Sequence, residues 1–288
     1  MSPGPLAPSI RLLALDIDGT LAARGDHVTA RTREALGRAA SAGISVVVAT
    51  GRRHRTAQPV VASLGLPVPT ICLGGALTKC ERGTTLAARS FRPEILACVA
   101  ERIRARGLAL VAQRDSQAPG EPDFLIDDEA PWNESTRSYF DANLRFARRV
   151  RSPAREPRGD VLVAGCFGPR EELLALAREL ESSLSGAVAA HVLEGLGLPD
   201  HHCQILPAGV SKWEALEHLA ALRGIPPEAV CAVGDEVNDL EMIRGAGLGV
   251  AMGNAAPGVR AAADLVIGRH DEDGLVGLVD GLLRGTVG

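Results

Sequence analysis

A short apolar run at residues 10–15 ends abruptly in the acidic turn Asp-Ile-Asp-Gly-Thr at 16–20. Only Arg11 interrupts the apolar run, and this pattern predicts a buried strand. Two acids that alternate along a strand point to the same side, and a Gly-Thr turn exposes backbone N–H groups beside them. Such acids repel each other unless a cation or a shared proton relieves them. The turn therefore predicts a site for a hard cation such as Mg2+ or, in a simpler interpretation, an acidic cap on the following helix.

Apolar strands and amphipathic helices alternate on both sides of a long central segment. Such an alternation is typical of a parallel βαβ sheet that helices cover on both faces. The expected strands are residues 10–15, 44–49, 69–73, 229–233, 248–252 and 265–267, and the expected helices are residues 29–42, 56–64, 211–222, 240–244, 259–263 and 273–283. We therefore predict an α/β fold with a Rossmann-like parallel-sheet core.

The central segment has a different character and predicts an inserted α+β domain. Its expected helices are 93–106 and 169–184, and its expected strands are 108–112, 123–127, 160–167, 187–193 and 201–206. We place the parallel-sheet core at 1–80 and 204–288, and the inserted domain at 81–203. An acidic block at 114–134 and an arginine block at 145–158 are interpreted as solvated surfaces. The aromatic residues gathered in this segment predict a small core or a dimer face.

The composition of the chain limits which partners it can bind and which cellular compartment it occupies. A net charge of −4 offers no basic surface for nucleic acid, and no apolar run approaches the roughly 18–20 residues of a membrane span. The six cysteines lack a C-x-x-C pair, which indicates free thiols in a reducing compartment. We therefore predict a cytoplasmic protein without a secretory signal, either a monomer or a homodimer.

Polar side chains gather at the ends of the expected parallel strands, where open α/β sheets bind ligands. They are Asp16, Asp18, Thr50, Asp235, Asn238 and Asp239, and Lys212 opens the helix before the strand at 229–233. Only two of the 31 basic residues are Lys, so a position that keeps Lys favours a compact point charge. Carboxylates call for a divalent cation, while a Lys, a hydroxyl and glycine-rich backbone amides form an anion cradle. This combination suits phosphoryl transfer through an aspartyl-phosphate. ATP or NAD cradles of the usual Gly-rich kinds are not expected, because the chain has neither of their motifs.

Four motifs in this order resemble the haloacid dehalogenase (HAD) superfamily of Mg2+-dependent phosphatases, in the Cof-like branch with a large type IIB cap inserted after the third core strand. They are Asp-Ile-Asp-Gly-Thr at 16–20, Thr-Gly-Arg at 50–52, Gly-Val-Ser-Lys at 209–212, and Gly-Asp-Glu-Val-Asn-Asp at 234–239 with Met242. The segments Ala-Met-Gly-Asn-Ala at 251–255 and Asp-Gly at 273–274 also fit. The resemblance covers about 10–80 and 203–284, and it implies the HAD fold with a cap that closes over the site and selects the substrate.

The resemblance implies a role for each matching residue. Asp16 is the expected nucleophile, and Asp18 is expected to protonate the leaving group and then activate water. Asp16, Asp18 and Asp235 are the expected Mg2+ ligands, Asp18 also through its backbone carbonyl. Lys212 is expected to neutralise the phosphate and the nucleophile, with Asp239 in support. The expected phosphate contacts are Thr50, Gly51, Arg52 and Asn238.

Three positions depart from the family pattern. Gly74 stands where Asn usually ends the third strand, and we interpret this as altered substrate preference. Trp213 replaces a small residue after the Lys and is expected to pack against the cap or narrow the entrance. His270 replaces an Asn before the acidic pair at 271–272, and we interpret it as neutral drift.

The predicted function is that of a Mg2+-dependent phosphatase acting on a small phosphorylated metabolite, such as a sugar phosphate. A sugar phosphomutase is the alternative, because related proteins share the Asp-x-Asp-Gly-Thr turn. A non-catalytic phosphate-responsive binding protein, like a response-regulator receiver, is a third hypothesis. Receivers span about 100–150 residues without a cap, and a switch has no need of a leaving-group acid such as Asp18.

Overall fold

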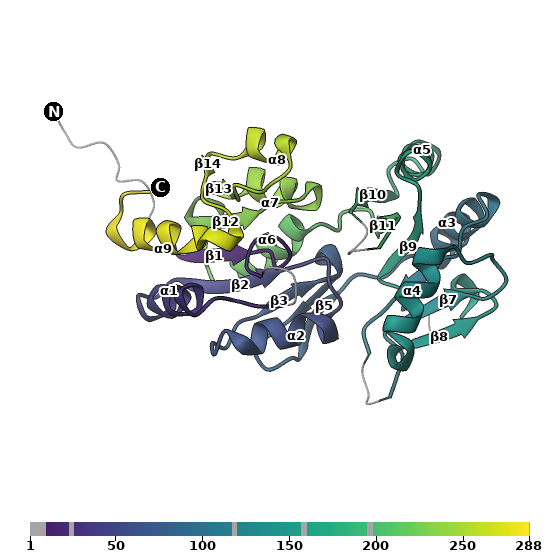
Figure 1. Ribbon diagram of the computed structural model, residues 1–288, viewed down its shortest axis with the longest axis horizontal. Coiled ribbons are helices and arrows are strands. Elements are labelled where there is room, and N and C mark those ends of the chain that lie inside the picture. Colours follow the sequence, from purple (N-terminus) through teal and green to yellow (C-terminus); the bar gives the residue numbers. More distant parts are fainter. Residues whose placement is uncertain (1–9, 23–25, 117–119, 157–159, 195–197, 288) are drawn as a thin grey trace. The chain divides into compact units, whose positions relative to one another are not determined.

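The computed structural model describes residues 10–22, 26–116, 120–156, 160–194 and 198–287. The chain divides into two compact units, which we name the first unit (1–87 with 211–288) and the second unit (88–210). Figure 1 shows the elements of both units. Within the described ranges, every helix is too short or too polar to cross a bilayer.

The described strands of the first unit form an eight-stranded sheet in the order β14-β13-β12-β1-β2-β3-β4-β5. They are β1 (Leu12–Leu15), β2 (Ser45–Ala49), β3 (Thr70–Cys72), β4 (Leu77–Lys79), β5 (Thr85–Ala88), β12 (Val230–Gly234), β13 (Leu248–Ala251) and β14 (Leu265–Val266). The pairs from β14 to β3 are parallel, and β4 returns antiparallel to β3. The predicted parallel core is confirmed, with an antiparallel β3–β4 pairing that the sequence pattern did not show.

Helices cover the first unit's sheet because its central strands are apolar on both faces. Leu12 and Ala14 of β1 pack with Leu216 and Leu219 of α6, while the alternate residue Leu13 is also fully buried. The helices of this unit are α1 (Ala30–Ser41), α2 (His54–Ser63), α6 (Lys212–Leu222), α7 (Leu240–Gly245), α8 (Pro257–Ala262) and α9 (Gly274–Arg284). Helices α1 and α9 pack against each other (Figure 1).

The boundaries of the inserted unit lie a few residues later than the expected divisions at 80/81 and 203/204. The structure places them at Ala87–Ala88 and Val210–Ser211. Strand β5 pairs within the first unit's sheet, so the change in composition near residue 81 marks only the polar turn before β5. The later expected division falls inside β11 (His201–Pro207), which pairs with the second unit's β9 and β10.

The second unit contains a six-stranded sheet in the order β10-β11-β9-β6-β7-β8, which is antiparallel except for the parallel β7–β8 pair. Besides β11, its strands are β6 (Val111–Gln113), β7 (Phe124–Asp127), β8 (Ala147–Val150), β9 (Val163–Gly168) and β10 (Val188–Leu193), and its helices are α3 (Pro93–Ala105), α4 (Glu134–Ala142) and α5 (Arg170–Ser183). The predicted α+β character of the insertion agrees with this arrangement.

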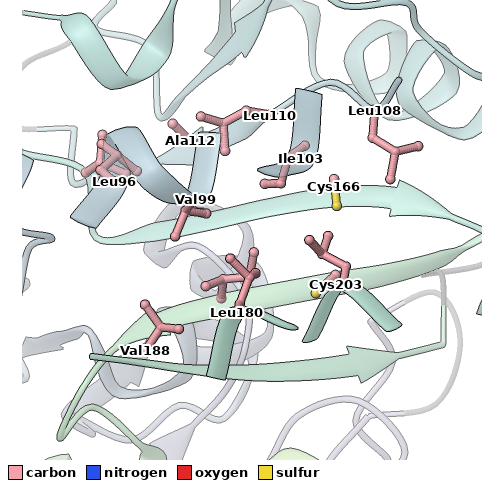
Figure 2. Close-up of a cluster of buried hydrophobic side chains, with 14 of the residues drawn as sticks. Leu96, Val99, Ile103, Leu108, Leu110, Ala112, Cys166, Leu180, Val188 and Cys203 are labelled. Atoms are coloured by element: carbon pink, nitrogen blue, oxygen red, sulfur yellow. The ribbon is translucent and has the colours of Figure 1, made fainter. Parts of the chain in front are cut away.

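One face of this sheet builds the main core of the second unit with α3 and α5. Figure 2 shows Val99 and Ile103 of α3 and Leu180 of α5 gathered around Cys166 of β9 and Cys203 of β11. The two cysteines are directly opposite each other in the β9–β11 ladder and are fully buried. All six cysteines are free thiols, which confirms that prediction; the cytoplasmic location stays a prediction.

Helix α4 and strand β8 were not among the expected elements, and β8 lies in the arginine block that was interpreted as a solvated surface. Asn133 caps α4, because its side chain accepts a hydrogen bond of 2.8 Å from the Thr136 amide. On the adjoining β8, Arg149 pairs with Asp128 and its guanidinium lies 4.7 Å from the centre of the Trp132 ring. The acidic and arginine blocks are thus partly paired with each other. The aromatic residues form the predicted small core, which includes Phe124, Phe140 and Phe167.

His202 is buried on β11, beside that aromatic cluster. Its ring centre lies 4.9 Å from that of Phe167. A Cβ at Gly165 would come within 2.7 Å of His202 Nε2, so only glycine leaves room for the imidazole there. Burial lowers the pKa of His202 from 6.5 to about 4, so the ring is neutral in the folded chain.

We expect the stability of the second unit to fall as the pH falls from 6.5 towards 4. In that window the unfolded chain binds a proton at His202 that the folded chain excludes, so protonation favours unfolding. The loss from this residue is about 2 kcal/mol at about pH 5. Urea unfolding followed by Trp132 fluorescence, in a Trp213→Phe background, measures it at about pH 7.5 and pH 5. A His202→Gln variant should lose less stability between these pH values; an equal loss in both proteins would contradict the prediction.

Candidate active site

The acidic turn begins where β1 ends, and its backbone is closed by local hydrogen bonds. The Asp16 amide still donates to Val233 of β12 over 3.1 Å, and the Ile17 carbonyl accepts from Leu21. Gly19 adopts φ 75°, and a Cβ there would lie 2.1 Å from Oδ2 of Asp235. Glycine is therefore required, both for the backbone conformation and for the close approach of Asp235 to the turn.

Lys212 joins two buried carboxylates at the centre of the site. It is the first residue of α6, whose N-cap Ser211 accepts a hydrogen bond from the Glu214 amide. Its Nζ lies 2.7 Å from Oδ1 of Asp16 and 2.6 Å from Oδ1 of Asp239. Burial lowers the pKa of Lys212, but the two carboxylates outweigh it and the net pKa is raised. Lys212 is therefore a permanent cation in this site.

Asp239 also fixes the turn that follows β12. Its Oδ2 accepts hydrogen bonds from the amides of Asp235 and Glu236, at 3.0 and 3.1 Å. A Cβ at Gly234 would lie 2.4 Å from Cγ of Asp239, so the strand must end in glycine for this carboxylate to fold back. Asn238 is nearby, with its Oδ1 3.5 Å from Lys212 Nζ. Each oxygen of Asp239 therefore has a separate structural task.

Asp16, Asp235 and Asp239 converge closely enough to hold a metal ion, since one oxygen of each lies within 4.8 Å of the others. Burial, reinforced by Asp239, raises the pKa of Asp235 to about 7. Burial also raises the pKa of Asp16, against the opposing effect of Lys212. Three carboxylates therefore face one ammonium, and this excess of negative charge on oxygen ligands fits a hard divalent cation such as Mg2+.

Asp18, which was expected beside Asp16 and Asp235, has its carboxylate outside that cluster. Its side chain is 52% exposed and forms a two-pronged ion pair with Arg52, at 2.8 Å from Nε and 2.5 Å from Nη2. Arg52 Nη1 also lies 2.7 Å from Oδ1 of Asp26. Burial lowers the pKa of Arg52, but its bonds to Asp18 and then Asp26 raise it overall. Arg52 thus contacts the acid in this structure, whereas its expected partner was a phosphate.

Thr50 directly follows β2 and is fully buried, at the same end of the sheet as Asp16. Its amide donates to Ile71, and its hydroxyl accepts from the Arg52 amide over 3.1 Å. Gly51 follows it directly. The turn after β3 packs closely on the start of α6. A Cβ at Gly75 in that turn would lie only 2.0 Å from the carbonyl oxygen of Ser211. Gly74 has φ 65°, a conformation that Asn also tolerates, and its effect on substrate preference stays a prediction.

The expected packing of Trp213 against the cap or at the entrance stays a prediction; within the first unit, Trp213 has a defined place. It packs on the core of the first unit, and a Cβ at Gly245 of α7 would come within 2.2 Å of its ring. Its ring therefore sets the distance between α6 and α7 within the first unit. His270 also contacts a specific partner, Asn254, at 2.9 Å.

Sequence reasoning missed Thr20, Asp26 and Asn254 as parts of the site. Thr20 donates to Oδ1 of Asp235 over 3.1 Å, and Asn254 lies 3.4 Å from Oδ2 of the same carboxylate. Thr20 and Asn254 belong to the sequence motifs at 16–20 and 251–255, but neither residue was given a role in the site. Asp26 had none, because nothing local links it to Arg52.

Comparisons with known proteins give a consistent result. A family model described as haloacid dehalogenase-like hydrolase matches residues 13–278. The chain is 28% identical to phosphatase YwpJ of Bacillus subtilis, over 95% of this chain and 100% of the relative. It is 32% identical to the HMP-PP phosphatase of Serratia proteamaculans, over 87% and 86% of the two chains. Among solved structures, the HAD subclass IIB sugar phosphatase BT4131 superposes with a TM-score of 0.76 at 22% identity, covering 96% and 100% of the chains.

Proposed function

Because the chain belongs to the haloacid dehalogenase-like hydrolases, we propose that it is a Mg2+-dependent phosphatase that hydrolyses a small phosphorylated metabolite through an aspartyl-phosphate at Asp16. The predicted family, fold class and enzyme class, a phosphoric monoester hydrolase, are confirmed. One observation supports the finer proposal most. Lys212 binds both Asp16 and Asp239, and Asp235 lies beside them. The proposed nucleophile, a cation and the proposed metal ligands thus lie together at the ends of β1 and β12.

In the first half-reaction, an Oδ atom of Asp16 attacks phosphorus and the bond to the ester oxygen breaks. Asp18 gives its proton to the departing oxygen. The permanent charge on Lys212 offsets the negative charge that would otherwise hold the carboxylate and the phosphate apart. Bound at Asp16 and Asp235, with the Asp18 backbone carbonyl, Mg2+ would supply Lewis-acid stabilisation of the phosphoryl oxygens.

In the second half-reaction, water attacks phosphorus and Asp18 takes its proton. The Asp16–oxygen–phosphorus link breaks at phosphorus, inorganic phosphate leaves, the Asp16 carboxylate is restored and Asp18 is protonated again. Thr50, the Gly51 amide and Asn238 are the proposed contacts of the phosphate oxygens, and Asp239 holds Lys212 and the Asp235 amide in place. Asp18 must be freed from Arg52 at some point in this cycle, because its proton is exchanged twice.

The substrate class is proposed from the relatives. One is named for HMP-PP and a structural neighbour for a sugar phosphate, and both are small phosphorylated compounds. We propose that the second unit is the cap that chooses among such compounds, in the cytoplasm, with the active protein a monomer or a homodimer.

A phosphate-release screen over a panel of phosphorylated sugars, vitamins and nucleotides, with and without Mg2+, tests the function. We expect steady release that requires Mg2+ in the wild type and is absent in Asp16→Asn. A coupled assay for hexose phosphate isomers runs beside it. Isomerisation without phosphate release would replace the phosphatase by a mutase, and binding without turnover would leave a phosphate-responsive binding protein.

Arg52 offers a test of its two possible roles. If it positions Asp18, Arg52→Lys should lower kcat by about 100-fold with little change in KM, because a misplaced acid weakens proton transfer. Asp26→Asn, which removes only the second ion-pair partner of Arg52, should also lower kcat, but by less than Arg52→Lys does. Steady-state kinetics on the best panel substrate measures both. A rise in KM at constant kcat would instead assign Arg52 to phosphate binding.

A further inference from the structure

Both oxygens of Asp235 are held by neutral donors. Oδ1 accepts a hydrogen bond of 3.1 Å from the Thr20 hydroxyl, which belongs to the acidic turn. Oδ2 lies 3.4 Å from Nδ2 of Asn254, and the same Nδ2 donates to the Gly19 carbonyl over 2.8 Å. Asn254 therefore ties the carboxylate to the backbone of the turn that bears Asp16.

The amide of Asn254 has only one orientation that satisfies its neighbours. Its Oδ1 accepts a hydrogen bond of 3.1 Å from the backbone amide of His270, and a backbone N–H cannot accept. The His270 ring nitrogen Nδ1 lies 2.9 Å from the same oxygen, which places the ring proton on Nδ1. A flipped amide would turn its NH2 group towards both donors and its oxygen towards two acceptors. His270 therefore directs the NH2 group at Asp235 and Gly19.

The two loops that present these side chains are fixed to each other and to the sheet. Met252 donates to Gly234 at the end of β12, and Gly253 donates to Gly268 over 3.3 Å. On the other side, Asp273 follows the His270 turn with φ 53° and accepts a hydrogen bond of 2.5 Å from Thr29, the N-cap of α1. The Asn254–His270 contact is therefore held by backbone that is anchored at both ends.

We propose that Asn254 is a positioning residue that orients Asp235 for Mg2+ and that His270 acts by locking the Asn254 amide. This inference rests on the proposed Mg2+-dependent function. It assigns a task to His270, which the sequence reading interpreted as neutral drift. Partners outside the ligand set typically change metal affinity by about 10–100-fold when removed, because they fix the orientation of the ligating group.

Mg2+ affinity measured without substrate tests the proposal. Isothermal titration and the rise of the melting temperature with Mg2+ give the dissociation constant of each folded variant. We expect Asn254→Ala to weaken Mg2+ binding about tenfold or more. His270→Ala should weaken it less, because the backbone donor remains, and His270→Asn, which keeps a side-chain donor, should restore most of the loss.

Asn143→Ala in the second unit and the exposed His218→Ala on α6 are the matched controls, and both should bind Mg2+ like the wild type. A wild-type dissociation constant in Asn254→Ala would overturn the inference, whether or not its melting temperature falls. If Asn254→Ala does not fold, equal affinities in the wild type, His270→Ala and His270→Asn would overturn it instead. A wild type that neither binds Mg2+ nor needs it for phosphate release would refute the proposed function itself.

Discussion

Replacing Asp16 with Asn is expected to reduce phosphate release by about four orders of magnitude or more, because the amide cannot form the phosphoenzyme. The fold should persist. Burial raises the pKa of Asp16, which shows that the charged form is costly there, and Lys212 keeps Asp239 as a partner at 2.6 Å. Rates over the substrate panel, with melting temperatures for both proteins, measure the two effects.

A matched exchange on the same unit provides the control. Asp280→Asn removes a carboxylate on α9 that pairs with Arg38, away from the acidic turn, and should leave the rate unchanged. Acid-quenched protein should carry phosphate in the wild type and none in Asp16→Asn. A variant that keeps a tenth of the wild-type rate would show that Asp16 is not the nucleophile.

Replacing Lys212 with Met is expected to abolish turnover and to destabilise the first unit by about 3–5 kcal/mol, since it leaves two buried carboxylates without their cation. The side chain is almost fully buried, with Nζ within 2.7 Å of both Asp16 and Asp239. Urea unfolding followed by Trp213 fluorescence, in a Trp132→Phe background, measures the loss next to the substitution.

The double variant Lys212→Met with Asp239→Asn separates the two effects. Removing one of the two buried carboxylates that have lost their cation should restore part of the stability. Lys212 and Asp239 are in contact, so the effects of the two substitutions are not additive. It should restore no activity. If Lys212→Met were as stable as the wild type, the carboxylates would not depend on Lys212 for charge compensation.

The first unit could be predicted from sequence because its elements repeat a simple pattern. Apolar strands such as Ser45–Ala49 are buried on both faces, and helices begin at recognisable caps such as Thr29 and Ser211. The second unit was harder. Strand β8 pairs with β7, and its Arg149 pairs with Asp128, yet both charged residues read locally as solvated surface.

Most residues of the candidate site were named from sequence and placed at one end of the sheet, but the contacts among them were not all foreseen. Asp18 was grouped with the metal ligands, whereas the clustered carboxylates are those of Asp16, Asp235 and Asp239. A tight turn decides which of two neighbouring acids faces inward, and periodicity does not describe turns. The Asn254–His270 contact joins two loops through space, so neither residue carries a local signal of the other.

The place of β1 has a consequence for how the chain is made. It lies between β2 and β12, yet β12 is translated only after the whole second unit. The second unit is continuous in sequence and has all its strands before the first unit has closed its sheet. Until then the nascent chain presents Asp16 without Lys212, beside an apolar strand with one open edge. If translation stops after the second unit and before β12, the fragment exposes an unpaired strand edge that favours aggregation.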